Sequence, residues 1–261
     1  MGNYRKISTT AHPPPGVKQH SAMTASEIEN RLSDVRQRIR SAEARYRRPP
    51  DSVTLIAVSK AQPASAILTA IAARQRAFGE SYLQEAVAKI DTLAQHTATP
   101  DIQWHFIGPI QSNKTRPIAE RFHWVHSIDR YRIAQRLNDQ RPAALPPLNV
   151  CVQVNISGET GKSGVPAGET GPLAQAVAQL PRLRLRGLMC VPAATDDPGQ
   201  QRGAFRQTRH LQERLIAEGL PLDTLSMGMS NDLEAAIAEG ATLVRAGTAV
   251  FGPRHYRGNH R

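Results

Sequence analysis

The sequence has few cysteines and no long apolar run, and each of these shortages excludes a class of protein. Two of its 261 residues are cysteine, Cys151 and Cys190, which is too few for a disulfide framework and suits buried thiols in a reducing compartment. No apolar stretch approaches the 18 residues that span a bilayer. We therefore expect a cytoplasmic globular protein, whose core is formed by the 40% of residues that are hydrophobic.

Acidic residues are also scarce, since 22 Asp and Glu face 33 Lys and Arg and give a formal net charge of +11. Such a charge could attract a nucleic acid. However, no basic cluster alternates with aromatic residues, so a solvated, arginine-rich surface is the better interpretation. A nucleic-acid binder stays as an alternative, and it would bind without a cofactor and with a steep salt dependence.

The chain divides into a tail and one domain. Residues 1–22 contain no acidic residue, three consecutive prolines and no apolar segment of the kind found in secretory signals. This composition predicts a disordered basic tail, and Met23 is an alternative start. Residues 23–261 are expected to form the domain, with a first helix that begins at Ser26, where residues 26–29 have capping-box spacing.

Short apolar runs alternate with amphipathic segments along the domain. In one segment Val87, Ile90 and Leu93 are expected to face inward, and Asp129 is expected to cap another helix. Strands are predicted at residues 53–60, 76–79, 103–107, 123–127, 149–155, 183–190, 224–227 and 242–246. Eight parallel strands joined by helices predict a closed (β/α)8 TIM barrel. The alternative, an open doubly wound sheet, usually has a Gly-rich turn after its first strand, where this chain has Ser-Lys-Ala-Gln-Pro.

The first predicted strand ends at Lys60. A buried ammonium is costly, and a lysine pushed toward the neutral amine can form a Schiff base with a carbonyl compound. In a TIM barrel the active face lies at the carboxyl ends of the strands, with phosphate often bound after strands seven and eight. Here those loops, residues 226–230 and 247–252, contain glycines and hydroxyls, and Ser230 or Asn231 could begin an anion-binding helix.

A compact phosphorylated aldehyde would fit this arrangement, and pyridoxal 5′-phosphate (PLP) is one. Its carbonyl would lie at Lys60 and its phosphate at the two loops. Arg245 would lie near the ring nitrogen. Because a guanidinium can only donate hydrogen bonds, it would keep that nitrogen unprotonated and weaken the ring as an electron sink.

Other motifs are weaker. Residues 157–163 resemble a phosphate-binding P-loop, but Ile156 stands where that motif needs its first glycine. His123 and His126 are an odd number of positions apart on a predicted strand, so they point to opposite faces and cannot chelate one metal together. His105 is interpreted as a packed or hydrogen-bonded residue. We expect no metal site.

Five segments resemble one known family, the pyridoxal phosphate homeostasis proteins (the YggS/PROSC group). They are Ala57–Lys60, Phe78–Glu80, Trp104–Lys114, Ser226–Ser230 and Val244–Thr248, and the resemblance runs in consistent order from about Thr24 to Tyr256. It implies a barrel similar to the N-terminal domain of alanine racemase, with PLP on Lys60 as a Schiff base and phosphate contacts from Ser226, Gly247 and Thr248. Ser81 and Asn231 stand where the family usually has asparagine and aspartate.

The resemblance also implies a carrier or reservoir of the cofactor, acting in vitamin B6 and amino-acid balance without established turnover. Expected partners are PLP and PLP-dependent apo-enzymes, without membrane or nucleic acid, and the chain is expected to be a monomer. The residues expected to bind the cofactor are Lys60, Tyr82, Asn155, Ser226, Met229, Arg245, Gly247 and Thr248.

The alternative function is a PLP-dependent amino-acid racemase of fold type III. Racemisation needs a base on each side of the substrate α-carbon. Lys60 could supply one, and Tyr82, Tyr131 or His105 would have to supply the other.

Overall fold

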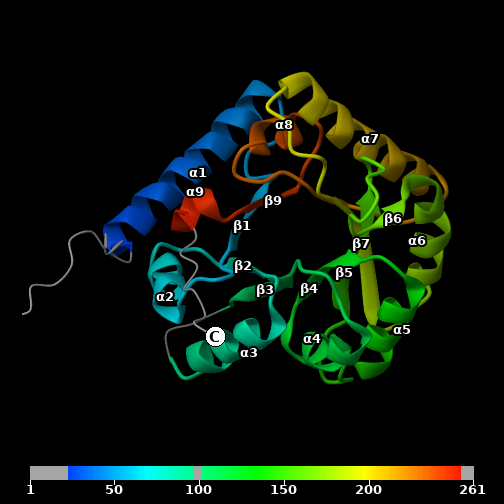
Figure 1. Ribbon diagram of the computed structural model, residues 1–261, viewed down its shortest axis with the longest axis horizontal. Coiled ribbons are helices and arrows are strands. Elements are labelled where there is room, and N and C mark those ends of the chain that lie inside the picture. Colours follow the sequence, from blue (N-terminus) through cyan, green and yellow to red (C-terminus); the bar gives the residue numbers. More distant parts are fainter. Residues whose placement is uncertain (1–22, 97–100, 254–261) are drawn as a thin grey trace, which may run out of the picture.

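The computed structural model describes residues 23–96 and 101–253, so the predicted basic tail lies outside the described residues. The strands form a ring, with helices packed around its outside (Figure 1). In chain order the strands are β1 (Thr54–Val58), β2 (Ala77–Glu80), β3 (Gln103–Phe106), β4 (Trp124–Ile128), β5 (Leu148–Asn155), β6 (Val165–Pro166), β7 (Leu183–Cys190), β8 (Thr224–Ser226) and β9 (Leu243–Ala246).

All pairings in the ring are parallel. β1 pairs with β2 on one side and with β9 on the other, and the pairing of β4 with β5 completes the circle. The two-residue β6 only extends the edge of β5. The eight remaining strands coincide with the eight predicted ones, and the predicted closed barrel is confirmed.

Helices follow most of the strands and cover the barrel. They are α1 (Ala25–Arg45), α2 (Ala64–Ala72), α3 (Leu83–Ala94), α4 (Thr115–Arg121), α5 (Tyr131–Gln140), α6 (Thr170–Ala178), α7 (Pro198–Ala217), α8 (Leu233–Ala238) and α9 (Thr248–Phe251), with short 3-10 turns η1 (Ser112–Lys114) and η2 (Ala167–Glu169). Within the described residues no helix is both long and apolar enough to cross a membrane.

The additional helix α1 packs against α2, α8 and α9 and lies outside the ring of strands (Figure 1). Its predicted start at Ser26 is wrong. The N-cap is Thr24, whose hydroxyl accepts from the backbone N–H of Glu27 while the Glu27 carboxylate accepts from the backbone N–H of Thr24. The capping box therefore begins two residues earlier than predicted, because Thr24 and Glu27 are also separated by three positions.

Residues alternate between the barrel interior and the helix-covered outside, as the pleat of a strand requires. Leu55 and Ala57 of β1 belong to the large core beneath the helices, whereas Ile56 belongs to a small separate cluster with residues of other strands, namely Ala77, Trp124, Cys151, Met189 and Leu243. Buried polar side chains from the same set of strands, including His105, His126, Ser226 and Arg245, contact one another across the barrel interior.

Two further details differ from the predictions. On α3 the buried residues are Ala86, Lys89 and Leu93, whereas Val87 and Ile90 are half-buried, so a charged residue occupies the inner face. Asp129 does not cap α5; the N-cap is Arg130 without a side-chain hydrogen bond, and Asp129 pairs with the Arg130 guanidinium instead. At Lys89 an ion pair occupies a helix face that the pattern predicts to be apolar. At Asp129 an ion pair takes the carboxylate that was predicted to cap the helix.

Candidate functional site

Two pockets open at the carboxyl ends of the strands, and Lys60 lines both. The first pocket has a volume of about 340 Å³, and the residues predicted to bind the cofactor that line it are Lys60, Met229, Arg245, Gly247 and Thr248. The second pocket is wider, about 980 Å³, and Lys60 and Tyr82 line it together with residues of the β3–α4 segment such as Gln111 and Lys114. Lys60 itself is half-buried, two residues beyond the end of β1.

The backbone on both sides of Lys60 is held by a buried ionic cluster. Lys89 on α3 donates from Nζ to the carbonyl oxygen of Ser59 at 2.7 Å and to Glu80 Oε1 at 2.8 Å. It also pairs with Glu85, whose carboxylate accepts from the backbone N–H of Ala61 at 2.6 Å. Residues 59 and 61 are therefore fixed, and Lys60 projects from between them.

Glu80 is fully buried, and its other partner is the hydroxyl of Ser59, which donates at 2.6 Å. Burial raises the pKa of Glu80, and the charge and hydrogen bond of Lys89 act in the opposite direction. The helical pattern did not predict this cluster. Its signals in the sequence are that Glu80 and Ser59 lie at the carboxyl ends of neighbouring strands and that Glu85 and Lys89 are four positions apart on one helix.

The two predicted phosphate loops lie side by side. The hydroxyl of Ser230 accepts from the backbone N–H of Ala249 at 3.2 Å, which links the loop after β8 to the start of α9. Gly228 has φ +91°, a conformation that favours glycine, and a Cβ there would lie 2.5 Å from the Ala236 side chain. The loop can therefore approach α8 this closely only with glycine at position 228.

The helix expected to begin at Ser230 or Asn231 begins later, since α8 starts at Leu233 with Asp232 as N-cap. Asp232 accepts from the backbone N–H of Met229, and the nearby Glu234 pairs with Arg38 of α1 at 2.7 Å. Both carboxylates are thus engaged by other groups. Any anion in the first pocket has the loop backbone and hydroxyls as partners, together with Lys60 and Arg245.

Arg245 is buried and belongs to a hydrogen-bonded chain through the barrel interior. Its Nη1 donates to Ser226 Oγ at 2.6 Å and its Nη2 to the carbonyl oxygen of Cys190 at 2.9 Å. Ser226 Oγ lies 2.7 Å from His126 Nδ1, and His126 Nε2 lies 2.9 Å from His105 Nδ1. The chain therefore connects a pocket residue to the centre of the barrel.

The direction of these hydrogen bonds follows from Arg245, which can only donate. If the Ser226 hydroxyl donates a hydrogen bond to His126 Nδ1, then His126 donates from Nε2 to His105 Nδ1, and His105 Nε2 is the ring nitrogen of this chain that stays without a partner. The reverse direction would leave the Ser226 hydroxyl hydrogen unpaired as well, and each buried unpaired group is costly. Both histidines are neutral, because burial lowers the pKa of His105 to about 3 and that of His126 well below its ordinary value.

Ser226 and Asn155 are expected to bind the cofactor, yet neither lines either pocket. Ser226 is fully buried beneath the first pocket, with its hydroxyl bonded to Arg245 and His126. Asn155, at the end of β5, donates from its side-chain amide to the carbonyl oxygen of Glu159 at 2.9 Å. These two assignments stay predictions. Met229, Gly247 and Thr248 lie together with Lys60 and Arg245, as expected.

The segment that resembles a P-loop forms turns between β5 and β6. Lys162 pairs there with Glu159 and lines neither pocket. His123 and His126 do point in opposite directions: His126 faces the barrel interior, whereas His123 Nδ1 accepts from the backbone N–H of Trp104 at 3.0 Å. His105 is packed and hydrogen-bonded as interpreted, and it also stacks on Trp124 with ring centroids 5.5 Å apart.

The sequence matches one family model over most of its length, the alanine racemase N-terminal domain, at residues 31–255. Among curated relatives, the pyridoxal phosphate homeostasis protein of Pseudomonas aeruginosa is 58% identical over 231 residues, which is 88% of this chain and 97% of the relative. The protein of the same name from Escherichia coli is 54% identical, over 88% of this chain and 98% of its own length.

Solved structures agree with this assignment. PipY of Synechococcus elongatus with PLP bound is 37% identical and superposes with a TM-score of 0.74, covering 86% of this chain and 100% of PipY. The alanine racemase of Corynebacterium glutamicum shares the fold at 18% identity, with a TM-score of 0.67 over 88% of this chain and 62% of that enzyme. Barrel, site and relatives together show that the chain belongs to the pyridoxal phosphate homeostasis proteins, built on the alanine racemase N-terminal domain.

Proposed function

We propose that the protein holds PLP on Lys60 as a Schiff base and acts as a carrier or reservoir in the homeostasis of PLP and amino acids. The observation that carries this proposal is the first pocket, where a lysine with a hydrogen-bonded backbone on either side lines the same cavity as two glycine-containing loops and a buried arginine. PLP would supply an aldehyde that condenses reversibly with an amine. This donor set fits such a ligand, because it pairs a single amine with several anion-binding groups.

Each residue of the pocket has a defined part in the proposal. Lys60 supplies the amine, and Gly247 and Thr248 supply a backbone N–H group and a hydroxyl to the phosphate. Arg245 donates toward the ring nitrogen and, being held by Ser226 and Cys190, keeps a fixed orientation. Because arginine stays charged at neutral pH, it cannot accept a proton back, and the ring is kept as a weak electron sink.

A racemase is less well supported, because none of the three residues proposed as the second base lines the first pocket. Tyr82 lines only the second pocket and is 53% exposed, Tyr131 is 45% exposed and lines neither pocket, and His105 is buried with Nδ1 bonded to His126. A carrier needs only reversible condensation, for which Lys60 suffices. Loss of α-deuterium from labelled alanine at enzyme-like rates would reverse this preference.

The decisive experiment is an absorbance spectrum of the purified protein, followed by borohydride reduction and peptide mapping. We expect a visible band that Lys60→Ala abolishes, with the reduced adduct on the peptide that contains Lys60. Lys162→Ala, which changes another loop lysine outside both pockets, should leave the band unchanged. An adduct on a different lysine, with a normal spectrum in Lys60→Ala, would contradict the assignment.

We further propose that the protein is a cytoplasmic monomer that delivers the cofactor to PLP-dependent apo-enzymes. Its two cysteines support a reducing compartment, since both are buried and free and burial raises the pKa of Cys151 to about 12. Light scattering on the PLP-loaded protein tests the monomer. Activation of an apo-enzyme faster than by the same concentration of released PLP tests delivery, and equal rates would argue against it.

A further inference from the structure

A third recess lies at the opposite end of the barrel, where β1, β2 and β3 begin. It has a volume of about 450 Å³, and Thr54, Ala77 and Gln103, the first residues of these strands, line it. Six residues of extended chain separate Thr54 from Lys60, roughly 20 Å at the usual rise per residue. The recess is therefore distinct from the two pockets at Lys60.

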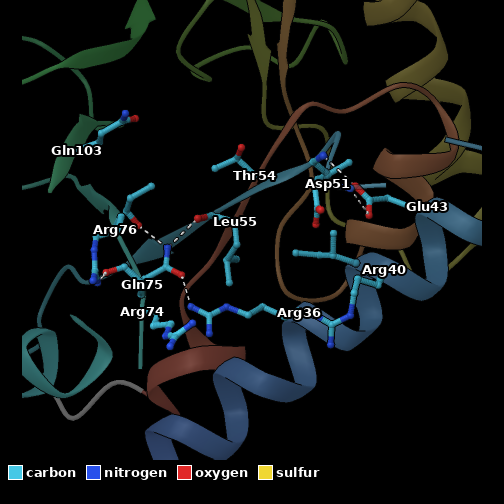
Figure 2. A pocket seen from close by; sticks show the side chains of 13 residues that line it. Arg36, Arg40, Glu43, Asp51, Thr54, Leu55, Arg74, Gln75, Arg76 and Gln103 are labelled. Atoms are coloured by element: carbon cyan, nitrogen blue, oxygen red, sulfur yellow. Dashed lines mark hydrogen bonds between the residues drawn. The ribbon is translucent and has the colours of Figure 1, made fainter. Parts of the chain in front are cut away.

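Four arginines line this recess, as Figure 2 shows. Arg36 and Arg40 lie one turn apart on α1, and Arg74 and Arg76 belong to the turn between α2 and β2. We refer to these four residues as the arginine recess. Burial lowers the pKa of Arg36, and the neighbouring charges of Arg40 and Arg76 lower it further, so these guanidinium groups repel one another.

Gln75 fixes the centre of the recess. Its side-chain amide is buried and donates to the carbonyl oxygens of Leu55 and Ala77, both at 2.8 Å, while its oxygen accepts from Arg36 Nη2 at 3.1 Å (Figure 2). Arg36 also donates from Nη1 to the carbonyl oxygen of Ala73 at 2.8 Å. The Arg36 guanidinium is thus held in place without a charged partner.

No carboxylate of the described residues forms an ion pair with any of the four arginines, although other arginines of the chain are paired. Glu43 and Asp51 line the same recess. Glu43 is buried and accepts instead from the backbone N–H groups of Asp51 and Val53. Even with both carboxylates counted, the lining carries an excess of two positive charges.

The carboxyl end of α2 neutralises only part of the positive charge of these arginines. Arg76 donates to the carbonyl oxygen of Ile71 at 2.8 Å and Arg36 to that of Ala73, both at the carboxyl end of α2. A helix end is equivalent to about half a negative charge, whereas the two guanidinium groups bring two. Arg40 and Arg74 donate to no carbonyl of that helix.

Arg74 occupies a position where glycine would be the more stable choice. It follows the C-cap of α2 with φ +61°, and a residue with a Cβ is disfavoured there. Its exposed side chain forms no hydrogen bond with the described residues. No such bond therefore offsets the disfavoured backbone conformation of Arg74. Strained residues of this kind often mark a binding position.

From this arrangement we infer that the arginine recess binds a small phosphorylated molecule, with the phosphate between Arg36, Arg74 and Arg76. A phosphate monoester carries about two negative charges at neutral pH, which matches the excess of the lining. Its oxygens point in several directions and suit guanidinium groups that approach from two elements. The apolar floor, formed by Ile39, Val53 and Leu55, leaves room for a small organic group.

The test is calorimetric titration of the PLP-saturated protein with inorganic pyrophosphate, because bound PLP keeps the first pocket closed to the probe. We expect one saturable site per chain. Arg74→Gly and Arg76→Gln should each weaken binding about tenfold, the usual effect of losing one charged hydrogen-bond donor. Arg31→Gln removes an exposed arginine of α1 outside the recess and should leave the affinity unchanged.

Arg74→Gly separates binding from folding, since glycine relieves the backbone while it removes the charge. The inference is overturned if pyrophosphate does not saturate a site, if Arg74→Gly binds as tightly as the native chain, or if Arg31→Gln weakens binding equally. Succinate, a dicarboxylate, should bind more weakly than pyrophosphate. Tighter binding of succinate would overturn the assignment to phosphate. The comparison of Arg74→Gly with Arg31→Gln does not depend on which lysine carries PLP.

Discussion

At the scale of single residues, Lys60 owes its position to an ionic cluster in which Glu85 lines the second pocket, whereas Lys89 and Glu80 line neither pocket. Lys89 and Glu80 are almost completely buried and fix Ser59, while Glu85 fixes Ala61. A buried ion pair of this kind adds little net stability, but removal of one partner leaves an uncompensated charge. The cluster therefore ties the geometry of the lysine to the stability of the barrel.

Lys89→Met should lower the free energy of unfolding by about 3 kcal/mol or more, because Glu80 would stay buried without a cation. Urea denaturation measures this loss. Lys162→Met, which breaks the surface pair with Glu159, serves as the control and should cost less than about 1 kcal/mol. Equal losses in the two variants would show that the buried cluster contributes no more to the free energy of unfolding than a surface ion pair does.

The two buried histidines predict a pH dependence. The unfolded chain binds a proton on His105 at the ordinary pKa of about 6.5, whereas the native state binds it only near pH 3. Stability therefore falls as the pH falls from 6.5, by on the order of 1–2 kcal/mol at pH 5.0 from His105, and His126 acts in the same direction; the His105 loss levels off below its native pKa.

Denaturation at pH 6.5 and 5.0 measures this dependence. His105→Gln should reduce the difference between the two pH values, and His210→Gln, at an exposed position on α7, should not. An unchanged difference in His105→Gln would mean that His105 is already protonated in the native state. Sequence indicated that His105 is a packed residue, but its bond to His126, 21 positions away, depends on the register of β3 and β4.

At the scale of elements, the loop after β8 shows how closely a turn and a helix can approach. Gly228 packs against α8, and Arg38 of α1 reaches the same loop by donating to the carbonyl oxygen of Ser230 at 3.0 Å. The sequence predicted that a glycine-containing loop follows this strand. The later start of α8 was not predicted, because the side chain of Asp232 bonds back to Met229 and delays the first helical turn.

Gly228→Ala should destabilise the protein by about 2 kcal/mol or more and weaken PLP binding. The substitution combines a disfavoured φ with a Cβ 2.5 Å from Ala236, which cannot relax without a shift of α8. Gly219→Ala is the matched control, because it has a similar φ of +96° but no atom within 4 Å of the added Cβ. Thermal unfolding and PLP titration of both variants separate the clash from the backbone strain; similar behaviour would exclude the clash.

At the scale of the whole molecule, closure of the ring joins the first and last strands. β1 pairs with β9 from Thr54 to Ala57, so the beginning and the end of the domain stabilise each other. The two predicted phosphate loops and Lys60 meet only because of this pairing. A single domain over residues 23–261 remains our proposal for the organisation of the chain.

Closure predicts that the domain unfolds as one cooperative unit. Tryptophan fluorescence reports on Trp104 and Trp124, on β3 and β4, and circular dichroism reports on all helices. We expect the two signals to change at the same urea concentration, in PLP-free protein. Separated transitions would indicate that one part of the barrel unfolds independently, and would argue against a single domain.

The sequence by itself determined the order of strands and helices, the lysine after the first strand and the glycine loops after the last two. These features follow from local rules, since the periodicity of side chains and the conformational freedom of glycine act over a few residues. Tertiary structure alone decided which distant polar groups meet. His126 and Ser226 are 100 positions apart, and Arg36 reaches Gln75 across 39. Such contacts depend on the tilt and register of a closed sheet, which no local pattern specifies.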